Sequence, residues 1–409
     1  MKQTNLSKWM RSSIVGTALL AMSGCGGDGA AVSDYNPESY QLTTSEVVAT
    51  STSHTCVIDA QQSLWCFGDD YSGEVTGNGE RNDVKQLTPI QVLPGEKFKF
   101  VGATGGATFA IKNDGTLWSW GRNNYGQRGI DKSSDRREDW KPLQIGEDAD
   151  WRMVRGSGSN HGACAIKESG TLWCWGDNRF GQVGNGGATG AEDEPVQVGT
   201  DTTWMDVSLG VFSACGVKED QSLWCWGSNA AVVNEEGEFE GRSSHEPAAV
   251  LADKKIRSMN VYADNGCALT TESELYCWGS NSVGQLLGTP PVSELLGTRK
   301  IVSNDNWKKI AVVAGTFCGL GQDGTVECWG GNLAGSLGRG ISDADLLHTT
   351  VIAPVVFDGF FTDLTGGFAS FYGRTIDGEL YGWGNGTWGR LGQGTDQAEY
   401  TTPVSITLE

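Results

Sequence analysis

One hydrophobic hexapeptide recurs seven times along this chain at nearly constant spacing. Residues 171–176 read TLWCWG and residues 222–227 read SLWCWG, and every copy ends in an aromatic residue followed by glycine. These dyads are Phe67-Gly68, Trp120-Gly121, Trp175-Gly176, Trp226-Gly227, Trp278-Gly279, Trp329-Gly330 and Trp383-Gly384. The steps between them are 53, 55, 51, 52, 51 and 54 residues. This period indicates a repeat protein, and it overrides the two or three domains that 409 residues would otherwise suggest.

Each repeat reads as short β-strands separated by turns rich in Gly, Asn and Asp, without a sustained helical period. Strand alternation puts Leu172 and Cys174 on one face of their strand and Trp173 and Trp175 on the other. Neither face is polar, so the strand must be buried on both sides. A sheet of about four strands covered on both faces by copies of itself is a propeller blade. The sequence therefore predicts an all-β, seven-bladed β-propeller of about 52-residue repeats over residues 45–409.

The end of the chain predicts how the ring closes. Its last residues, TPVSITLE, match the P-x-x-V segment that elsewhere leads directly into the next repeat. We expect the chain termini to close the ring, with the seventh unit docked against the first and residues 403–408 near the N-terminal strand. Closure removes exposed sheet edges, which favours this arrangement.

The residues that follow each dyad resemble a known repeat family. In repeat two they are Asn123, Tyr125, Gly126, Gln127 and Gly129, and in repeat three Asn178, Phe180, Gly181, Gln182 and Gly184. Together with the hexapeptide, this pattern resembles the regulator-of-chromosome-condensation repeats. Repeat four departs from it with NAAVVNEEGEFEG, and repeat one is distorted to YSGEVTG. The resemblance implies the propeller fold, but it says little about function, because one fold hosts many activities.

The N-terminus has the features of an export signal. Lys2, Lys8 and Arg11 precede a short apolar run from Ile14 to Met22, which is too short for a stable membrane-spanning helix. Met22-Ser23-Gly24-Cys25 resembles the lipobox of bacterial lipoproteins. We expect residues 1–24 to be removed, Cys25 to be lipidated and residues 25–44 to form a flexible tether. The alternative is an ordinary signal peptide in which the cysteine falls at this place by chance.

This interpretation places the protein outside the bacterial cytoplasm. Lipid-anchored, it would belong to the outer membrane or cell surface, and otherwise it would be periplasmic or secreted. Contact with the membrane is then expected only through the anchor.

Ten further cysteines form five pairs, each ten residues apart at the same two repeat positions. The pairs are Cys56 and Cys66, Cys164 and Cys174, Cys215 and Cys225, Cys267 and Cys277, and Cys318 and Cys328. Repeats two and seven have neither cysteine, and instead carry Phe109 with Ser119 and Tyr372 with Gly382. The two positions flank a hairpin turn, where directly opposed Cα atoms lie about 4.5 Å apart.

The pairing predicts five disulfides, each within one repeat, and an oxidising compartment. Zinc binding is the rival interpretation, but C-x9-C is an unusual ligand spacing and the pairs lie on different blades. We therefore predict no metal site.

A search for catalytic motifs finds none. His54, His161, His245 and His348 occupy four different repeats, so a structural role is expected rather than metal ligation. H-E-x-x-H, G-x-S-x-G and G-x-x-x-x-G-K are absent from the sequence. A G-x-G-x-x-G begins at Gly384, within the repeat dyad, and is interpreted as turn chemistry. No catalytic residue and no cofactor are predicted.

Carboxylates recur at the turn before each hexapeptide: Asp59, Asp114, Glu168, Asp220, Glu272, Asp323 and Asp377. They would form an acidic ring on one face of the disc. Asp and Glu beside Gly are favoured turn formers, however, and the D-x-D-x-D spacing of a calcium loop is absent. We therefore interpret these carboxylates as turn chemistry.

The net charge restricts the class of partner. The formal charge of -20 becomes -23 once residues 1–24, with three positive and no negative side chains, are removed. A protein with this negative net charge does not attract nucleic acid or anionic lipid through its overall electrostatic field. The acidity favours solubility and cationic partners.

Departures from the repeat are the candidate recognition elements, because propeller loops display function on a rigid scaffold. The longest span residues 132–140, 232–246, 286–306 and 339–352, and they are expected on one side of the disc. Tyr71, Tyr125, Phe180 and Trp388 recur at the start of the same loop segment. They would serve either as exposed contact anchors or as packing against the next blade.

Three functions follow from these observations. We favour a monomeric, non-catalytic propeller that presents one loop face to a protein partner, as an enzyme inhibitor or a surface scaffold. Members of the resembling family act as exchange factors on a small nuclear GTPase, and a secreted bacterial member inhibits β-lactamase. The alternatives are a hydrolase or lyase acting on extracellular polysaccharide, and a purely structural surface protein. An enzyme would bring two or more titratable residues together at the central channel.

Overall fold

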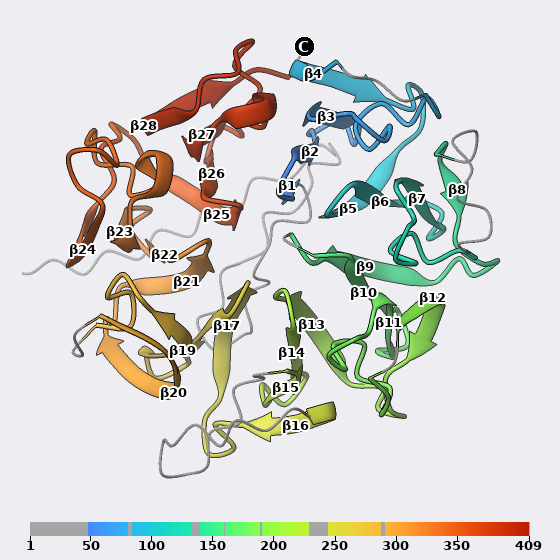
Figure 1. The fold of residues 1–409 in the computed structure, drawn as a ribbon, viewed down its shortest axis with the longest axis horizontal. Coiled ribbons are helices and arrows are strands. Elements are labelled where there is room, and N and C mark those ends of the chain that lie inside the picture. Colours follow the sequence, from blue (N-terminus) through green and yellow to red (C-terminus); the bar gives the residue numbers. More distant parts are fainter. Residues whose placement is uncertain are drawn as a thin grey trace, which may run out of the picture. The chain divides into compact units, whose positions relative to one another are not determined.

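The computed structural model describes residues 48–80, 84–131, 140–158, 160–188, 190–228, 244–287 and 291–408. The predicted signal segment, the tether and Cys25 lie outside these residues. The described chain forms seven antiparallel sheets of four strands each, arranged as blades around a central axis (Figure 1). The predicted seven-bladed, all-β fold is confirmed.

Every blade consists of four strands that are consecutive in the sequence. Blades 1 to 4 contain β1 (Val48–Thr50), β2 (His54–Ile58), β3 (Leu64–Gly68), β4 (Gln86–Val92); β5 (Phe98–Thr104), β6 (Ala107–Lys112), β7 (Leu117–Gly121), β8 (Leu143–Gln144); β9 (Trp151–Gly156), β10 (Gly162–Lys167), β11 (Leu172–Asp177), β12 (Ala191–Gln197); and β13 (Trp204–Leu209), β14 (Ser213–Lys218), β15 (Leu223–Gly227), β16 (Ser244–Val250). Blades 5 to 7 contain β17 (Ile256–Tyr262), β18 (Asn265–Thr270), β19 (Glu274–Asn281), β20 (Val292–Ser303); β21 (Trp307–Val312), β22 (Thr316–Gly321), β23 (Val326–Gly331), β24 (His348–Pro354); and β25 (Phe361–Gly367), β26 (Ser370–Thr375), β27 (Leu380–Asn385), β28 (Glu399–Ile406). Short 3₁₀ turns follow the third strand in blade 6, as η3 (Leu333–Gly335), and in blade 7, as η4 (Thr387–Gly389).

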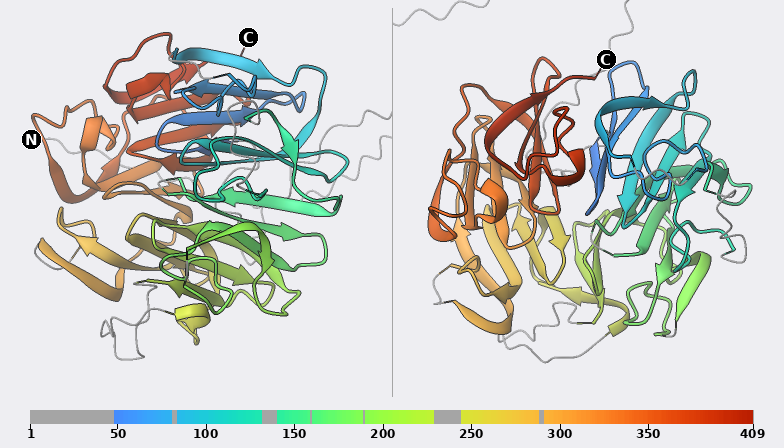
Figure 2. Two further views of the ribbon diagram at one scale, coloured as in Figure 1. Left: turned by 45° about the vertical axis from the view of Figure 1, so that its right-hand side comes forward. Right: turned by 45° about the horizontal axis from the view of Figure 1, so that its top comes forward.

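The first strand of each blade lies nearest the axis and the fourth lies at the rim (Figures 1 and 2). The third strand carries the recurrent hexapeptide. In β11, Leu172 and Trp175 have no exposed surface, and Trp173 is partly buried. Burial on both faces of this strand explains why its sequence is apolar at consecutive positions rather than alternating.

The tryptophan of five dyads joins its blade to the preceding one. The indole N–H of Trp175 donates to the backbone carbonyl of Gln127, which lies 2.9 Å away in blade 2. The same bond recurs from Trp120 to Glu74, Trp226 to Gln182, Trp329 to Gln285 and Trp383 to Ser336, at 2.9–3.1 Å. A buried carbonyl left without a donor is costly, so each bond helps to fix the spacing between blades.

The glycine of each dyad is required by the backbone. Gly176 has a φ of 93°, and a Cβ at this position would lie 2.1 Å from the carbonyl oxygen of His161. Only glycine adopts this conformation and also allows the neighbouring turn to approach so closely.

Five disulfides connect the second and third strands of their blades, with Cα atoms 4.0–4.1 Å apart. Each joins directly opposed residues, as in the register of Cys164 with Cys174. In blades 2 and 7 the opposed pairs are Phe109 with Ser119 and Tyr372 with Gly382. An aromatic ring beside a small residue therefore occupies the place of the disulfide in these two blades.

The ring closes where blade 7 packs on blade 1. β28 pairs with β27 inside blade 7, and its Ile406 lies in one apolar cluster with Leu391 of the same blade and with Val48 and Phe67 of blade 1. The termini therefore close the ring, as predicted, and they do so through side-chain packing between two separate sheets.

Candidate functional site

The loops of the propeller emerge at two opposite ends of the blades. We call the end that carries the β1–β2 turns and β3–β4 loops, and their equivalents, the loop face. Backbone hydrogen bonds connect these two kinds of loop, from Arg122 to Gly106 (2.7 Å), Asp177 to His161 (3.1 Å) and Asn385 to Ala369 (2.9 Å). We call the opposite end, with the β2–β3 turns and the connections between blades, the turn face.

The predicted long departures follow the third strand, so their described residues between the third and fourth strands belong to the loop face, whereas residues 304–306 lie beyond β20 on the turn face. Two segments predicted as loops are partly strands, because Val292–Ser303 forms β20 and His348–Pro354 forms β24. Residues 132–139, 229–243 and 288–290 lie outside the described part of the chain.

The four predicted aromatic anchors stand on the loop face in neighbouring blades. Trp388 belongs to blade 7, Tyr71 to blade 1, Tyr125 to blade 2 and Phe180 to blade 3. We call these four residues the aromatic arc. Trp388, Tyr125 and Phe180 are 40%, 39% and 37% exposed, and Tyr71 is partly buried. Large aromatic side chains at this exposure are typical anchors of protein interfaces.

Part of the arc also packs against the following blade. The ring of Tyr125 stacks on His161 of blade 3, with centroids 4.4 Å apart. Phe180 meets Phe212 of blade 4 edge-on at 4.6 Å. The packing interpretation therefore applies to this pair, and more than a third of the surface of each ring stays accessible. The contacts restrict the rings, which lowers the entropy lost on binding.

Three arginines that the sequence interpretation missed accompany the arc. Arg122 lies over the ring of Tyr71 at 5.9 Å, and Arg179 lies over Tyr125 at 5.5 Å. Arg390 lies 5.0 Å from the ring of Trp388. These arginines occupy variable repeat positions, so no periodic signal marked them. Tyrosine, tryptophan and arginine are the residue types most enriched in binding hot spots.

The histidines of the first and third blades are structural, as expected. His54 is fully buried, its Nε2 lies 2.8 Å from the hydroxyl of Thr108, and burial lowers its pKa to about 3. Burial also lowers the pKa of His161, whose Nδ1 lies 3.1 Å from the carbonyl of Gly105. Within the described residues, no group of three His, Cys, Asp or Glu side chains could hold a metal ion.

The carboxylates of the turn face stabilise their own turns. Asp114 accepts hydrogen bonds from the backbone N–H and the hydroxyl of Thr116, at 2.9 and 2.7 Å. Asp220 and Asp323 make the same two contacts with Ser222 and Thr325. These bonds lower the pKa of all three carboxyl groups. The structure therefore agrees with turn chemistry for these residues.

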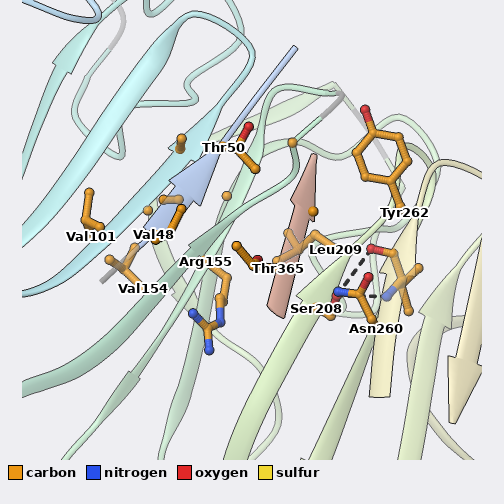
Figure 3. A pocket seen from close by; sticks show the side chains of 17 residues that line it. Val48, Thr50, Val101, Val154, Arg155, Ser208, Leu209, Asn260, Tyr262 and Thr365 are labelled. Carbon is orange, nitrogen blue, oxygen red and sulfur yellow. Dashed lines mark hydrogen bonds between the residues drawn. The ribbon is translucent and has the colours of Figure 1, made fainter. Parts of the chain in front are cut away.

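Residues of the innermost strands line a cavity at the axis of the ring. Figure 3 shows its lining, including Val48, Val101, Val154 and Leu209. The cavity has a volume of about 60 Å³, which is room for only a few water molecules. A cavity of this size does not support the alternative of a polysaccharide-acting hydrolase or lyase, which was predicted to have its site at the propeller face.

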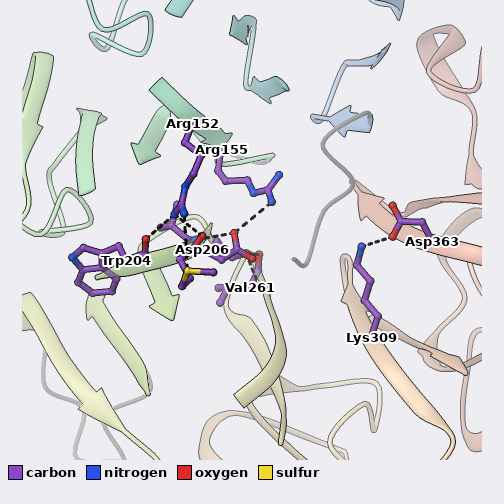
Figure 4. Close-up of polar contacts among 10 residues, drawn as sticks. Arg152, Arg155, Trp204, Asp206, Val261, Lys309 and Asp363 are labelled. Atoms are coloured by element: carbon purple, nitrogen blue, oxygen red, sulfur yellow. Dashed lines mark hydrogen bonds and ion pairs between the residues drawn. The ribbon is translucent and has the colours of Figure 1, made fainter. Parts of the chain in front are cut away.

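Polar contacts join neighbouring blades close to the axis (Figure 4). The guanidinium of Arg155 in blade 3 lies 3.4 Å from the carboxylate of Asp206 in blade 4, and both side chains are buried. Arg152 donates to the carbonyl of Trp204 at 2.7 Å, and Lys309 pairs with Asp363 between blades 6 and 7. The charged groups near the channel are thus engaged in connecting blades.

Comparison with known proteins agrees with this fold. Two regulator of chromosome condensation (RCC1) repeat profiles match, one at residues 98–127, 156–182 and 256–285 and the other at residues 114–165 and 377–409. The chain is 24% identical to the ultraviolet-B receptor UVR8 of Arabidopsis thaliana, over 76% of this chain and 70% of that protein. It is 24% identical to the human E3 ubiquitin-protein ligase HERC2 over 57% of this chain, a match that spans only 5% of the ligase.

Solved propellers superpose on most of this chain. Human WBSCR16 aligns with a TM-score of 0.70 at 17% identity, covering 84% of this chain and 93% of that one. Yeast RCC1 (Prp20), solved in complex with Kap60, aligns with a TM-score of 0.69 at 15% identity, covering 95% and 91%. No helix in the described part of the chain is long and apolar enough to cross a membrane. The repeat profiles over these segments and the blade architecture together support a seven-bladed β-propeller of RCC1 repeats.

Proposed function

We propose that this protein is a non-catalytic binding propeller that presents its aromatic arc to a protein partner. The observation that carries the proposal is the arc itself, with three aromatic side chains 37–40% exposed on one face. Two of them are held in place by aromatic contacts with the next blade. Arg122 is partly exposed and Arg179 is exposed, so both can supply hydrogen-bond donors for the rim of an interface, whereas Arg390 is buried beneath Trp388.

Related propellers support a protein partner. Yeast RCC1 has been solved with Kap60, and Prp20p of Saccharomyces cerevisiae is described with its binding to Gsp1p and histones. At this low sequence identity the comparison indicates the same fold, and it does not indicate that this chain binds any of these partners. The net charge of -20 disfavours nucleic acid and favours a partner with a cationic surface. We expect the propeller to act as a monomer, as an inhibitor or a surface scaffold.

We further propose that the protein is exported and anchored through a lipid on Cys25. The motivation is the signal-like N-terminus that ends in Met22-Ser23-Gly24-Cys25. The five disulfides support this placement, because such bonds persist in oxidising compartments.

Affinity capture tests the binding face. The propeller, residues 40–409, is immobilised and exposed to periplasm and culture supernatant. The triple variant Tyr125→Ala, Phe180→Ala, Trp388→Ala should lose the captured partner. A matched control replaces three exposed apolar residues of the turn face, Val356→Ala, Phe360→Ala, Ile376→Ala, and should retain it. A partner that is lost with the control and kept with the arc variant would move the binding face to the other end.

A further inference from the structure

A pocket opens on the loop face at the boundary between blades 5 and 6. It has a volume of about 380 Å³, which lies within the range of small-ligand sites, roughly 300–1,000 Å³. Its lining comes from the β17–β18 turn and the β19–β20 loop of blade 5, and from the β21–β22 turn and the β23–β24 loop of blade 6. We call it the blade 5–6 pocket. No residue of the aromatic arc lines it.

The pocket is open because small residues occupy two repeat positions that carry rings at the boundary of blades 2 and 3. There the ring of Tyr125 stacks on His161. Counted from the dyads and the cysteines, the equivalent residues are Val283 and Gly315. A Cβ on Gly315 would lie 3.3 Å from Cγ2 of Val283, so the two residues face each other as the two rings do. An isopropyl group and a hydrogen atom therefore replace two rings.

The ion pair beside those rings is replaced as well. At the boundary of blades 2 and 3, Arg179 lies over the ring of Tyr125 and pairs with Asp177 at 2.8 Å. The equivalent residues of blade 6 are Leu333 and Gly331. The chain fills one boundary with its own rings and guanidinium group, and it leaves the other boundary for a group from outside.

The walls of the blade 5–6 pocket are apolar and reachable from solvent. Leu333 and Leu347 are 42% and 64% exposed, and Val283 is partly buried. Covering exposed hydrocarbon surface around a concave site is favourable. A side chain that enters the pocket therefore gains from apolar contact with both blades.

A single carboxylate gives the pocket its charge. Among the described residues that line it, only Asp264 is charged, and this residue is exposed. Desolvation raises the pKa of its carboxyl group, and no hydrogen bond or cation from the described residues opposes this effect. A cation beside the carboxylate would stabilise its charged form.

The polar amide side chains of the lining are engaged within the protein. The amide of Asn265 donates to the carbonyl of Ser280 at 2.8 Å, and the amide of Gln285 donates to Asn265 at 3.4 Å. Asn332 donates to a backbone carbonyl at 3.0 Å. The carboxylate of Asp264 is therefore the charged acceptor that remains for a ligand.

We infer that the blade 5–6 pocket binds an arginine side chain of the protein partner. This inference rests on the proposed function, because it assigns a chemical feature to the partner of the loop face. The methylene groups of an arginine cover apolar walls, and its planar guanidinium donates two parallel hydrogen bonds to a carboxylate. The net charge of -20 favours the approach of such a partner. A tyrosine ring would fill the space but would leave the carboxylate without a counter-ion.

The test titrates the purified full chain with the peptide acetyl-Gly-Gly-Arg-Gly-Gly-amide and follows saturation-transfer NMR signals of the peptide. We expect a Kd of about 1 mM, as for a single weak contact, with the strongest transfer to the arginine methylene protons. Two matched peptides replace the arginine by citrulline, its uncharged isostere, or by tyrosine. Both should bind at least about fivefold more weakly, because neither pairs with a carboxylate as a cation.

Two variants alter the pocket from the side of the protein. Asp264→Asn removes the carboxylate and should weaken binding of the arginine peptide at least about fivefold. Its control is Asp358→Asn, the same change at an exposed residue of the turn face. Leu333→Arg places the chain's own guanidinium at the position of Arg179 and should weaken binding at least about tenfold, because like charges repel and the space is filled.

The control for the second variant is Ile376→Arg, which adds the same charge at a turn-face residue that is 79% exposed. Both controls should bind like the parent chain. The inference is overturned if the arginine peptide does not bind, if the citrulline or tyrosine peptide binds as tightly, or if either pocket variant binds like the parent.

The arc variant separates this inference from the proposed function. Tyr125→Ala, Phe180→Ala, Trp388→Ala leaves the blade 5–6 pocket unchanged and should bind the arginine peptide like the parent chain. Peptide binding without any captured protein would contradict the proposed function and support the arginine site. A captured partner without peptide binding would support the proposed function and overturn the arginine site.

Discussion

The hydroxyl group of Tyr372 donates a hydrogen bond to the backbone carbonyl of Arg390, 2.8 Å away, at the boundary where the ring closes. At other boundaries the corresponding carbonyl accepts from the dyad tryptophan of the next blade, as in the bond from Trp175 to Gln127. Blade 1 has Phe67 at the dyad position, and phenylalanine has no donor. Tyr372 supplies the missing donor from a position that is a cysteine in five other blades.

Tyr372→Phe should therefore weaken ring closure. The substitution leaves a buried carbonyl without a donor and removes a contact of 2.8 Å with the hydroxyl of Thr55 in blade 1. We expect the free energy of unfolding to fall by about 1–3 kcal/mol, measured by equilibrium denaturation. Tyr381→Phe is the control, because the hydroxyl group of Tyr381 donates a hydrogen bond to the exposed carboxylate of Glu379 in the same blade. Equal stability of the two variants would contradict the role of Tyr372.

Glu74 should make stability depend on pH. Burial raises the pKa of this carboxyl group from 4.5 to about 8. In the unfolded chain it ionises near its ordinary value, so between about pH 4.5 and pH 8 the folded state binds more protons. Stability should then fall as the pH rises through this window and level off above it.

Glu74→Gln removes this dependence. The positions equivalent to Glu74 in blades 2 and 3 are Gln127 and Gln182. There the side-chain oxygen of glutamine accepts a hydrogen bond from the backbone N–H two residues earlier, as the carboxylate of Glu74 does from Ser72. The variant should be more stable than the parent at pH 8.5, by up to a few kcal/mol, and the difference should shrink at pH 5. Denaturation curves at the two pH values measure both quantities. A difference that grows toward acid would have the wrong sign.

Removing one disulfide should lower stability moderately. Cys215→Ala with Cys225→Ala opens a short loop whose two strands are already paired. We expect a loss of about 2 kcal/mol in the free energy of unfolding, since short loops gain least from a cross-link. Non-reducing peptide mapping of the parent should give five bridges, each within one repeat. A bridge between two repeats would contradict the pairing.

Deleting residues 402–409 should lower the melting temperature by several degrees and promote aggregation. The deletion removes most of β28 and, with it, Ile406, which is 4% exposed and packs in the cluster shared with blade 1. It also exposes the edge of β27. Thermal melting and light scattering are the measurements. A truncated chain that melts like the full chain would mean that the terminal strand does not hold the ring closed.

Mass spectrometry of membrane-extracted protein tests export. We expect a mature chain that begins at an acylated Cys25. Cys25→Ala should shift the protein from the membrane fraction to the soluble fraction. A chain that retains Met1, or that begins elsewhere, would exclude the lipoprotein interpretation.

The candidate site was predictable only in part. Tyr125 and Phe180 were found because they recur at one position after the dyad, and recurrence is visible in a sequence. Arg122 and Arg179 were not found, because each meets its ring only after two blades have packed together. The burial of Glu74 also depends on how the blades pack. The equivalent position carries glutamine in other blades, and the sequence alone does not show that a carboxyl group at this place is buried.

The sequence by itself determined the number of blades, the strands within them and the pairing of cysteines. These features depend on local turns and on the alternation of side chains along single strands, and the repeat states them many times. Only the tertiary structure decided what lies between the blades, including the contacts of Arg122 and Arg179 with the rings of the preceding blades and the bond from Tyr372 at the closure. Alternation specifies the face to which a side chain belongs. The residue that it meets there is set by how neighbouring sheets pack, over separations of about fifty residues within the ring and more than 300 at its closure.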